Sequence, residues 1–114
     1  MAACAAKPGS VEDYPFGDGV AVYKVAGKMF ALVPVGEEPS RISLKCDPDL
    51  ADSLRDRYTG ITAGYHLNKR HWNTVALDGS VPDDEVLDFI DHSYELVTAR
   101  LTKAQRSQLT GQAE

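Results

Sequence analysis

The residues from 66 to 73 combine several groups that bind anions or nucleobases. The stretch contains two histidines, two cations, two asparagines and the only tryptophan of the sequence, and it has no carboxylate. Lysine and arginine contact phosphates, asparagine donates to phosphates or base edges, and an aromatic ring stacks on an unpaired base. Together with the lysines of a nearby hairpin, the candidate nucleic-acid-binding residues are Lys24, Lys28, Asn68, Lys69, Arg70, Trp72 and Asn73.

The few charges of this stretch limit how tightly it can bind DNA. Lys69, Arg70 and neighbouring lysines could neutralise about three to five phosphates, which gives a salt slope of about −3 to −4 on duplex DNA. The sequence therefore predicts weak, salt-sensitive binding. A structural interpretation stays open beside it: Trp72 is a core aromatic at a strand start, Tyr65 caps the sheet, and the two cations belong to a solvated turn.

The same stretch supports a second hypothesis, in which the protein is an adaptor that binds a small molecule or a peptide. The pocket would be lined by Tyr65, His66, Asn68, His71 and Trp72. A catalytic role would need an acid or base within reach of one of the histidines. No serine or cysteine lies in a recognisable nucleophile setting, so we expect a protein that is not an enzyme.

Metal and cofactor motifs are weak in this sequence. His66 and His71 lack an obvious third ligand, whereas a zinc site needs three or four converging groups. Gly60 and Gly64 match no nucleotide-binding glycine motif, so they are interpreted as turn glycines. An acidic series could attract iron, but it fits a helix start and a solvated helix face: Asp83, Asp84, Glu85, Asp88, Asp91 and Glu95. No metal and no cofactor are therefore predicted.

Composition indicates an ordinary globular protein with unevenly distributed charge. The chain has 114 residues, 43% hydrophobic and 25% charged, with a net charge of −5. Residues 78–95 contain seven acids and no lysine or arginine, while residues 57–77 contain no acid. The region around the candidate site is thus distinctly basic. Glu12 and Asp13 could still contact the basic loop in the fold, which would make that loop structural.

Several features bear on the environment of the protein. The apolar run from Met1 to Ala6 is too short for a signal-peptide core and no basic residue precedes it, so we expect a cytoplasmic protein without a membrane segment. Cys4 and Cys46 have no metal-ligand spacing and are expected to be reduced. Cys46 fits a buried strand end, whereas Cys4 lies near a terminus, where a thiol can be exposed. A monomer is expected.

The elements that must position the candidate residues follow from turn signals and hydrophobic periodicity. Asp47 before Pro48 is a strong helix start, and Ile42, Leu44 and Cys46 alternate with polar residues as in a half-buried strand. The predicted elements are a helix over 2–7, strands over 20–25, 28–35 and 41–46, a helix over 48–58 with Leu50, Leu54 and Tyr58 on its buried face, a strand over 72–77, and a long helix from about 83 to 101. Residues 20–35 should form a hairpin around Ala26-Gly27.

This order, α-β-β-β-α-β-α, predicts an α+β fold in which helices cover one face of an antiparallel sheet. Length allows a single domain, which we place at residues 1–106. Residues 107–114 are polar, contain a glycine and are expected to form a frayed C-terminal tail.

With that order in hand, three segments resemble the MmcQ/YjbR family: VEDYPFG at 11–17, ISLKC at 42–46 and ITAGYHLNKRHWNTV at 61–75. The resemblance extends over nearly the whole chain. It implies a CyaY-like, frataxin-related α+β fold in a bacterial cytoplasmic protein. The family is commonly described as DNA-binding through a double-wing arrangement of strands and loops. The first helix is shorter here than is usual in the family, and Ala63 stands where a proline is often found.

Overall fold

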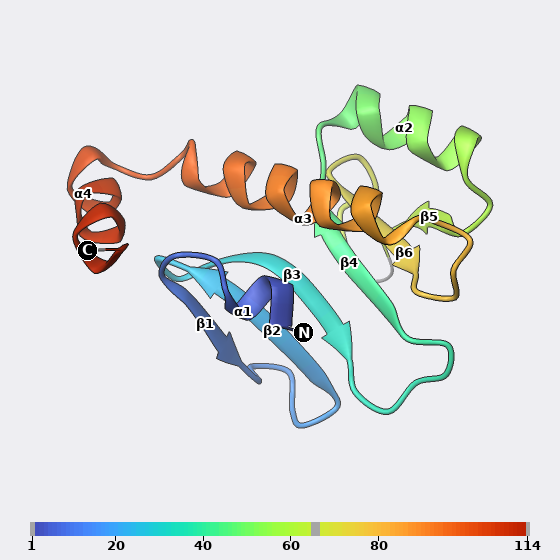
Figure 1. Cartoon of the computed structure of the whole chain (residues 1–114), viewed down its shortest axis with the longest axis horizontal. Coiled ribbons are helices and arrows are strands. Elements are labelled where there is room, and N and C mark those ends of the chain that lie inside the picture. The colour runs from blue at the N-terminus through green and yellow to red at the C-terminus, as the bar shows by residue number, and fades with distance from the viewer. Residues whose placement is uncertain (1, 65–66, 114) are drawn as a thin grey trace.

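The computed structural model describes residues 2–64 and 67–113, with the side chains of 109–113 excepted. It is an α+β fold built on one six-stranded antiparallel sheet, with strand order β1-β2-β3-β4-β6-β5 (Figure 1). This confirms the predicted fold class. The strands are β1 (Ser10–Asp13), β2 (Val20–Val25), β3 (Lys28–Pro34), β4 (Arg41–Lys45), β5 (Ile61–Ala63) and β6 (Trp72–Ala76), and the helices are α1 (Ala2–Ala5), α2 (Pro48–Arg57), α3 (Asp83–Thr98) and α4 (Lys103–Ala113).

The core lies between one face of the sheet and the first three helices. Val75 of β6 is opposite both Ile42 of β4 and Ile61 of β5, so these three side chains form a row on the helix-covered face. Ile90 of α3 and Leu54 of α2 belong to the same buried cluster. Figure 1 shows α3 crossing the sheet, while α4 stands apart at the C-terminal end. One face of the sheet is thus packed against helices.

The hairpin between β2 and β3 forms as predicted. Val25 pairs with Lys28 across a two-residue turn, in which Ala26 has a φ of 50° and Gly27 a φ of 77°. Positive φ at both central residues defines the type I′ turn, whose twist matches that of the flanking strands. The turn therefore fixes Lys28 at the very start of β3.

The helix after β4 begins where the sequence predicted. An Asp47 side-chain oxygen accepts hydrogen bonds from the N–H groups of Asp49, at 3.1 Å, and Leu50, at 3.5 Å, and Pro48 is the first helical residue. The predicted buried stripe is partly wrong, because Leu50 is 38% exposed. Ala51 occupies the buried position one turn before Leu54, so the apolar face is rotated by one residue.

Two strands were not predicted. In β1 three of the four residues are exposed, and β5 has only three residues, of which one is fully buried. β1 lacks the alternation of buried and exposed residues that identifies a strand in sequence, and β5 is too short for such an alternation to be recognised. Each is held by pairing with a neighbour, β1 with β2 and β5 with β6. The observed order is therefore α-β-β-β-β-α-β-β-α-α.

The C-terminal region also differs from the prediction. The long helix ends at Thr98, and a further helix, α4, begins at Lys103, so the expected tail boundary at 106 and 107 lies within it. Thr102 Oγ1 accepts from the Gln105 N–H at 3.2 Å, and Gln105 Oε1 accepts from the Thr102 N–H at 2.9 Å. This reciprocal capping box is a helix-start signal that is present in the sequence.

Both cysteines are free and buried, which corrects the expectation that Cys4 could be exposed. Burial raises the pKa of the Cys4 thiol to about 11, and that of Cys46 likewise to about 11. Within the described residues, every helix falls short of the length and hydrophobicity that a bilayer crossing requires.

Candidate nucleic-acid interface

Antiparallel pairing brings most of the candidate cations to one end of the sheet. Val25 at the end of β2 pairs with Lys28, and Lys45 at the end of β4 pairs with Trp72 at the start of β6. Residues 67–71, which lead into β6, lie at this same end because β6 begins there. We call the cations gathered there the basic end: Lys28, Lys45, Lys69, Arg70 and Arg100.

The segment that carries two of these cations is held by main-chain contacts. Asn68 Oδ1 accepts from the N–H of Arg70 at 2.9 Å, and the Asn68 carbonyl oxygen accepts from the N–H of His71 at 3.2 Å. The carbonyl oxygen of His71 in turn accepts from the N–H of Cys46 at 2.7 Å. The backbone of this turn is therefore fixed to Cys46, the residue that follows β4, while the side chains of Lys69 and Arg70 are exposed.

Arg55 of α2 fastens the same turn from the other side. Its guanidinium donates to the carbonyl oxygen of Lys69 at 2.5 Å and lies 3.6 Å from the carboxylate of Asp52. Arg55 was not among the predicted site residues. Its contact with Lys69 comes from tertiary structure, because the two residues lie on different elements.

Two residues of the predicted set are buried. Trp72 is 8% exposed and Asn73 is 3% exposed. Asn73 Nδ2 donates to the carbonyl oxygen of Ala51 at 3.3 Å, which ties β6 to α2. In this arrangement Trp72 offers no open ring face for stacking, and Asn73 offers no donor to a base edge.

Lys24 and the acids near the amino end interact with residues of β1, β2 and the turn between them. Lys24 Nζ lies 3.0 Å from Asp13 Oδ2. Glu12 accepts hydrogen bonds from the hydroxyls of Tyr23, at 2.8 Å, and Tyr14, at 3.2 Å, and these bonds lower the pKa of Glu12. Among the described residues, neither Glu12 nor Asp13 makes a hydrogen bond or ion pair with the basic loop. The contact expected between these acids and the basic loop is therefore not observed.

The remaining cations surround a recess at the basic end. It has a volume of about 240 Å³ and is lined by Lys28, Met29, Lys45, Trp72, Val97 and Arg100. None of these lining residues carries a carboxylate. Burial lowers the pKa of Lys45, and the positive charges of Arg100 and Lys28 lower it further. Arg100 was not among the predicted site residues, so its place here was not predicted.

Only three of the five residues predicted for a ligand pocket, Asn68, His71 and Trp72, belong to the described part of the chain. Asn68 is exposed, Trp72 is buried, and Tyr65 and His66 lie outside the described residues. A larger hollow of about 350 Å³ lies elsewhere and is lined by Phe16, Gly19, Val20, Leu32, Pro34, Glu37, Arg41, Ser43 and Leu67. Of the residues described, no group of three histidine, cysteine, aspartate or glutamate side chains is placed to hold a metal ion.

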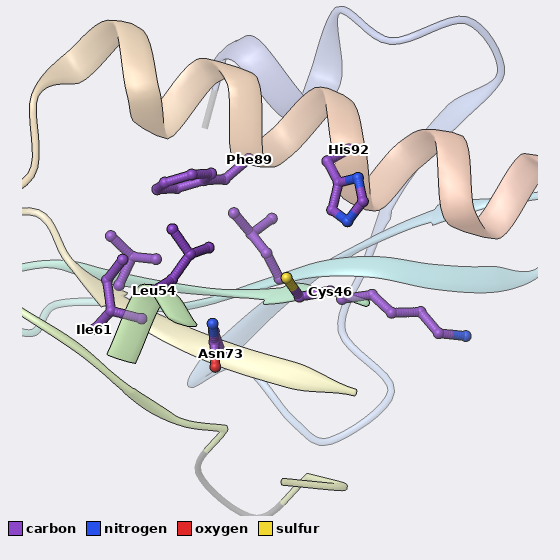
Figure 2. Close-up of a pocket in the computed structure, with 9 residues that line it drawn as sticks. Cys46, Leu54, Ile61, Asn73, Phe89 and His92 are labelled. Atoms are coloured by element: carbon purple, nitrogen blue, oxygen red, sulfur yellow. The ribbon is translucent and has the colours of Figure 1, made fainter. Parts of the chain in front are cut away.

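A second small space lies inside the core, beneath α3. Figure 2 shows Phe89 and His92 descending from α3 toward Cys46 and Asn73 of the sheet region, with Leu54 and Ile61 completing the wall. Its volume is about 10 Å³, close to the minimum that holds one water molecule. This space is a packing feature and not a ligand site.

Comparisons with known proteins place the chain in a family. The family model described as YjbR matches residues 5–96. The chain is 37% identical to the uncharacterized protein YjbR of Escherichia coli, over 93% of this chain and 90% of that protein. A crystal structure of a protein from Deinococcus radiodurans is 43% identical with a TM-score of 0.89, covering 96% of this chain and 83% of that one. A Pseudomonas syringae protein is 32% identical with a TM-score of 0.67, covering 76% and 86%. The chain therefore belongs to the YjbR family.

Proposed function

We propose that this protein is a small cytoplasmic nucleic-acid-binding module that holds the phosphate backbone at its basic end. The observation that carries the proposal is the sorting of charge along the sheet. The turns at the opposite end contain Asp18, Glu37, Glu38 and Asp78, and α3 starts there with three acids in its first turn. The basic end therefore favours a polyanion more than the opposite end does, although Asp47 and Asp49 at the start of α2 lie near it and the whole chain is acidic.

The exposed turn supplies the contacts that would meet a strand first. Lys69 and Arg70 extend from a fixed backbone, so less conformational freedom is lost when they bind a phosphate. The Asn68 side chain is occupied by the Arg70 N–H through its oxygen, which leaves its amide group as a donor. Contacts of this kind position a strand without reading its bases, so binding should tolerate changes of sequence.

The strength of binding can be bounded from the same residues. Five cations at the basic end neutralise at most five phosphates. The expected salt slope is then about −4.5 on duplex and about −3.5 on single strands. Because Trp72 is buried, a single strand gains no stacking on this ring. We therefore expect weak binding of both forms, without catalysis.

Fluorescence anisotropy of a labelled duplex and a labelled single strand, each titrated at about 50 and 200 mM salt, tests the proposal. Binding should appear at low salt and fall steeply with added salt. Lys69→Ala and Arg70→Ala should each weaken binding and reduce the slope by about one. Arg57→Ala removes an equal charge from an exposed position on α2 and should leave binding almost unchanged. Absence of binding at low salt, or equal losses in all three variants, would reject the proposal.

A further inference from the structure

We infer that the recess between β3, β4 and the end of α3 is a binding site for a phosphomonoester dianion, with Lys28, Lys45 and Arg100 as its cationic ligands. The inference deepens the proposed function and rests on it, because it gives one part of the basic end a specific partner group. The same chemistry is carried by free phosphate and by the terminal phosphate of a nucleic-acid strand.

The first argument is the origin of the three cations. Lys28 opens β3 after the type I′ turn, Lys45 closes β4, and Arg100 follows α3, so three separate elements direct positive groups to one recess. Such a convergence needs the full tertiary fold. It differs from a solvated charge run, in which neighbouring side chains diverge into water.

The second argument is the absence of compensation. No ion pair joins Lys28, Lys45 or Arg100 to an acid among the described residues. The positive neighbours of Lys45 act in the same direction as its burial and lower its pKa. Placing like charges close together destabilises the folded state, because they repel each other. Arrangements of this kind occur more often at binding sites than elsewhere. A bound dianion would reverse the repulsion.

The third argument concerns the size and charge of the partner. A phosphomonoester carries about −1.5 to −2 charges at neutral pH and three terminal oxygens, which match three cations. An internal phosphodiester carries one charge and has a sugar on either side. The volume of about 240 Å³ lies below the roughly 300 Å³ at which ligand pockets usually begin. The recess therefore suits a terminal group better than a whole ligand or a continuous backbone.

The single tryptophan offers a direct measurement, because Trp72 lines the recess. The full chain would be titrated with inorganic phosphate, and separately with a thymidine dinucleotide with or without a 5′-phosphate, while chloride keeps the ionic strength constant. We expect saturable changes in Trp72 fluorescence with phosphate and with the phosphorylated dinucleotide, and none with the unphosphorylated one. A much tighter response to the phosphorylated dinucleotide would identify a strand end as the natural source, and equal responses would identify free phosphate.

Variants separate this site from the exposed turn. Lys45→Gln and Arg100→Gln should each weaken phosphate binding about tenfold, because each loses a charge-assisted contact. Lys69→Gln, with the same loss of charge, should change it less than about twofold, since its side chain lies outside the recess. Circular dichroism would establish that each variant is folded, and Arg100→Gln serves if Lys45→Gln does not fold.

The outcomes distinguish the two proposals. Phosphate binding that depends on Lys45, without binding of longer strands, would keep the recess as an anion site and reject the nucleic-acid function. Binding of longer strands with no response to inorganic phosphate and no preference for a terminal phosphate would reject the recess and leave the proposed function standing. Equal fluorescence changes with chloride alone, or equal losses in Lys45→Gln and Lys69→Gln, would also overturn the inference.

Discussion

The hydroxyl of Ser93 on α3 donates to the carbonyl oxygen of Phe30 on β3 at 2.6 Å. The same hydroxyl accepts from the N–H of Lys45 on β4 at 2.9 Å. The two strands pair only at Ala31 with Leu44 and at Leu32 with Ser43, so Ser93 connects them where their ladder has already ended. One buried helix residue thereby satisfies two strand groups and fixes the backbone from which the Lys45 side chain enters the recess.

Replacing Ser93 should therefore destabilise the protein. Ser93→Ala leaves the Phe30 carbonyl and the Lys45 N–H without a partner, and each buried unsatisfied group costs about 1–3 kcal/mol. We expect the free energy of unfolding, measured with urea, to fall by about 2 kcal/mol. Ser53→Ala, at an exposed position of α2, is the matched control. A loss no larger than that of the control would show that the bridge contributes nothing.

The β2–β3 turn contains a conformation that alanine adopts at a cost. Ala26 is exposed and has a φ of 50°, and the left-handed region costs a residue with a Cβ roughly 1–2 kcal/mol. Asparagine is favoured at this position of a type I′ turn, so Ala26→Asn should raise the free energy of unfolding by about 1 kcal/mol. Ala26→Val should lower it. Thermal unfolding of both variants tests the pair, and shifts of the same sign would contradict the assigned turn.

Gly64 lacks a side chain where its backbone lies close to Trp72. A Cβ on Gly64 would lie 2.7 Å from the Cβ of Trp72 and 3.1 Å from its carbonyl oxygen, to which the Gly64 N–H donates at 2.9 Å. Gly64→Ala should cost about 1–3 kcal/mol, because the backbone must shift to remove the clash. The shift should also appear in the Trp72 emission spectrum. Gly19→Ala, where an added Cβ meets no heavy atom within 4 Å, should have a far smaller effect.

The hydrogen bonds to Glu12 predict a dependence of stability on pH. The hydroxyls of Tyr23 and Tyr14 lower the pKa of Glu12 in the folded state. A group whose pKa falls on folding stabilises the fold above its unfolded pKa, about 4.3 for glutamate, and this contribution disappears as pH falls through the folded pKa. The stability gap between wild type and Glu12→Gln should therefore be largest near pH 7 and close in acid.

Urea unfolding at pH 7, 5 and 3 would measure this gap. Asp56→Asn removes an exposed carboxylate of α2 and controls for the general change in net charge. If the Glu12→Gln gap stayed constant across this range, the two tyrosine hydroxyls would not be stabilising the charged carboxylate.

Local signals in the sequence were sufficient for the central elements. The alternation of Ile42, Ser43 and Leu44 predicted β4, and the Asp47-Pro48 pair predicted the start of α2, because both signals act between near neighbours. The half-buried character predicted for β4 is wrong, because Ser43 is also buried. The edge strand β1 lacked such a signal, since its residues face water and only its pairing with β2 makes it a strand. The capping box that starts α4 was present at Thr102 and Gln105 but was not used.

In the candidate site, too, local features could be predicted from the sequence and tertiary features could not. Exposure of Lys69 and Arg70 follows from a turn of a few residues, and the sequence indicated it. The meeting of Lys28 and Lys45 with Arg100 depends on strand pairing and on where α3 ends, and neither can be read from local composition. Burial of Trp72 likewise depends on packing between elements. A strand-like segment does not by itself indicate which of its side chains will be buried.

The outer strands of the sheet also affect how copies of the chain meet in concentrated solution. They are the shortest in the fold, with four residues in β1 and three in β5, so each offers few unpaired main-chain groups to a neighbour. At β1, Glu12 and Asp13 also place charged side chains along this outer strand, a feature that disfavours extension of a sheet. Short outer strands of this kind leave little free main chain on which a second copy could extend the sheet.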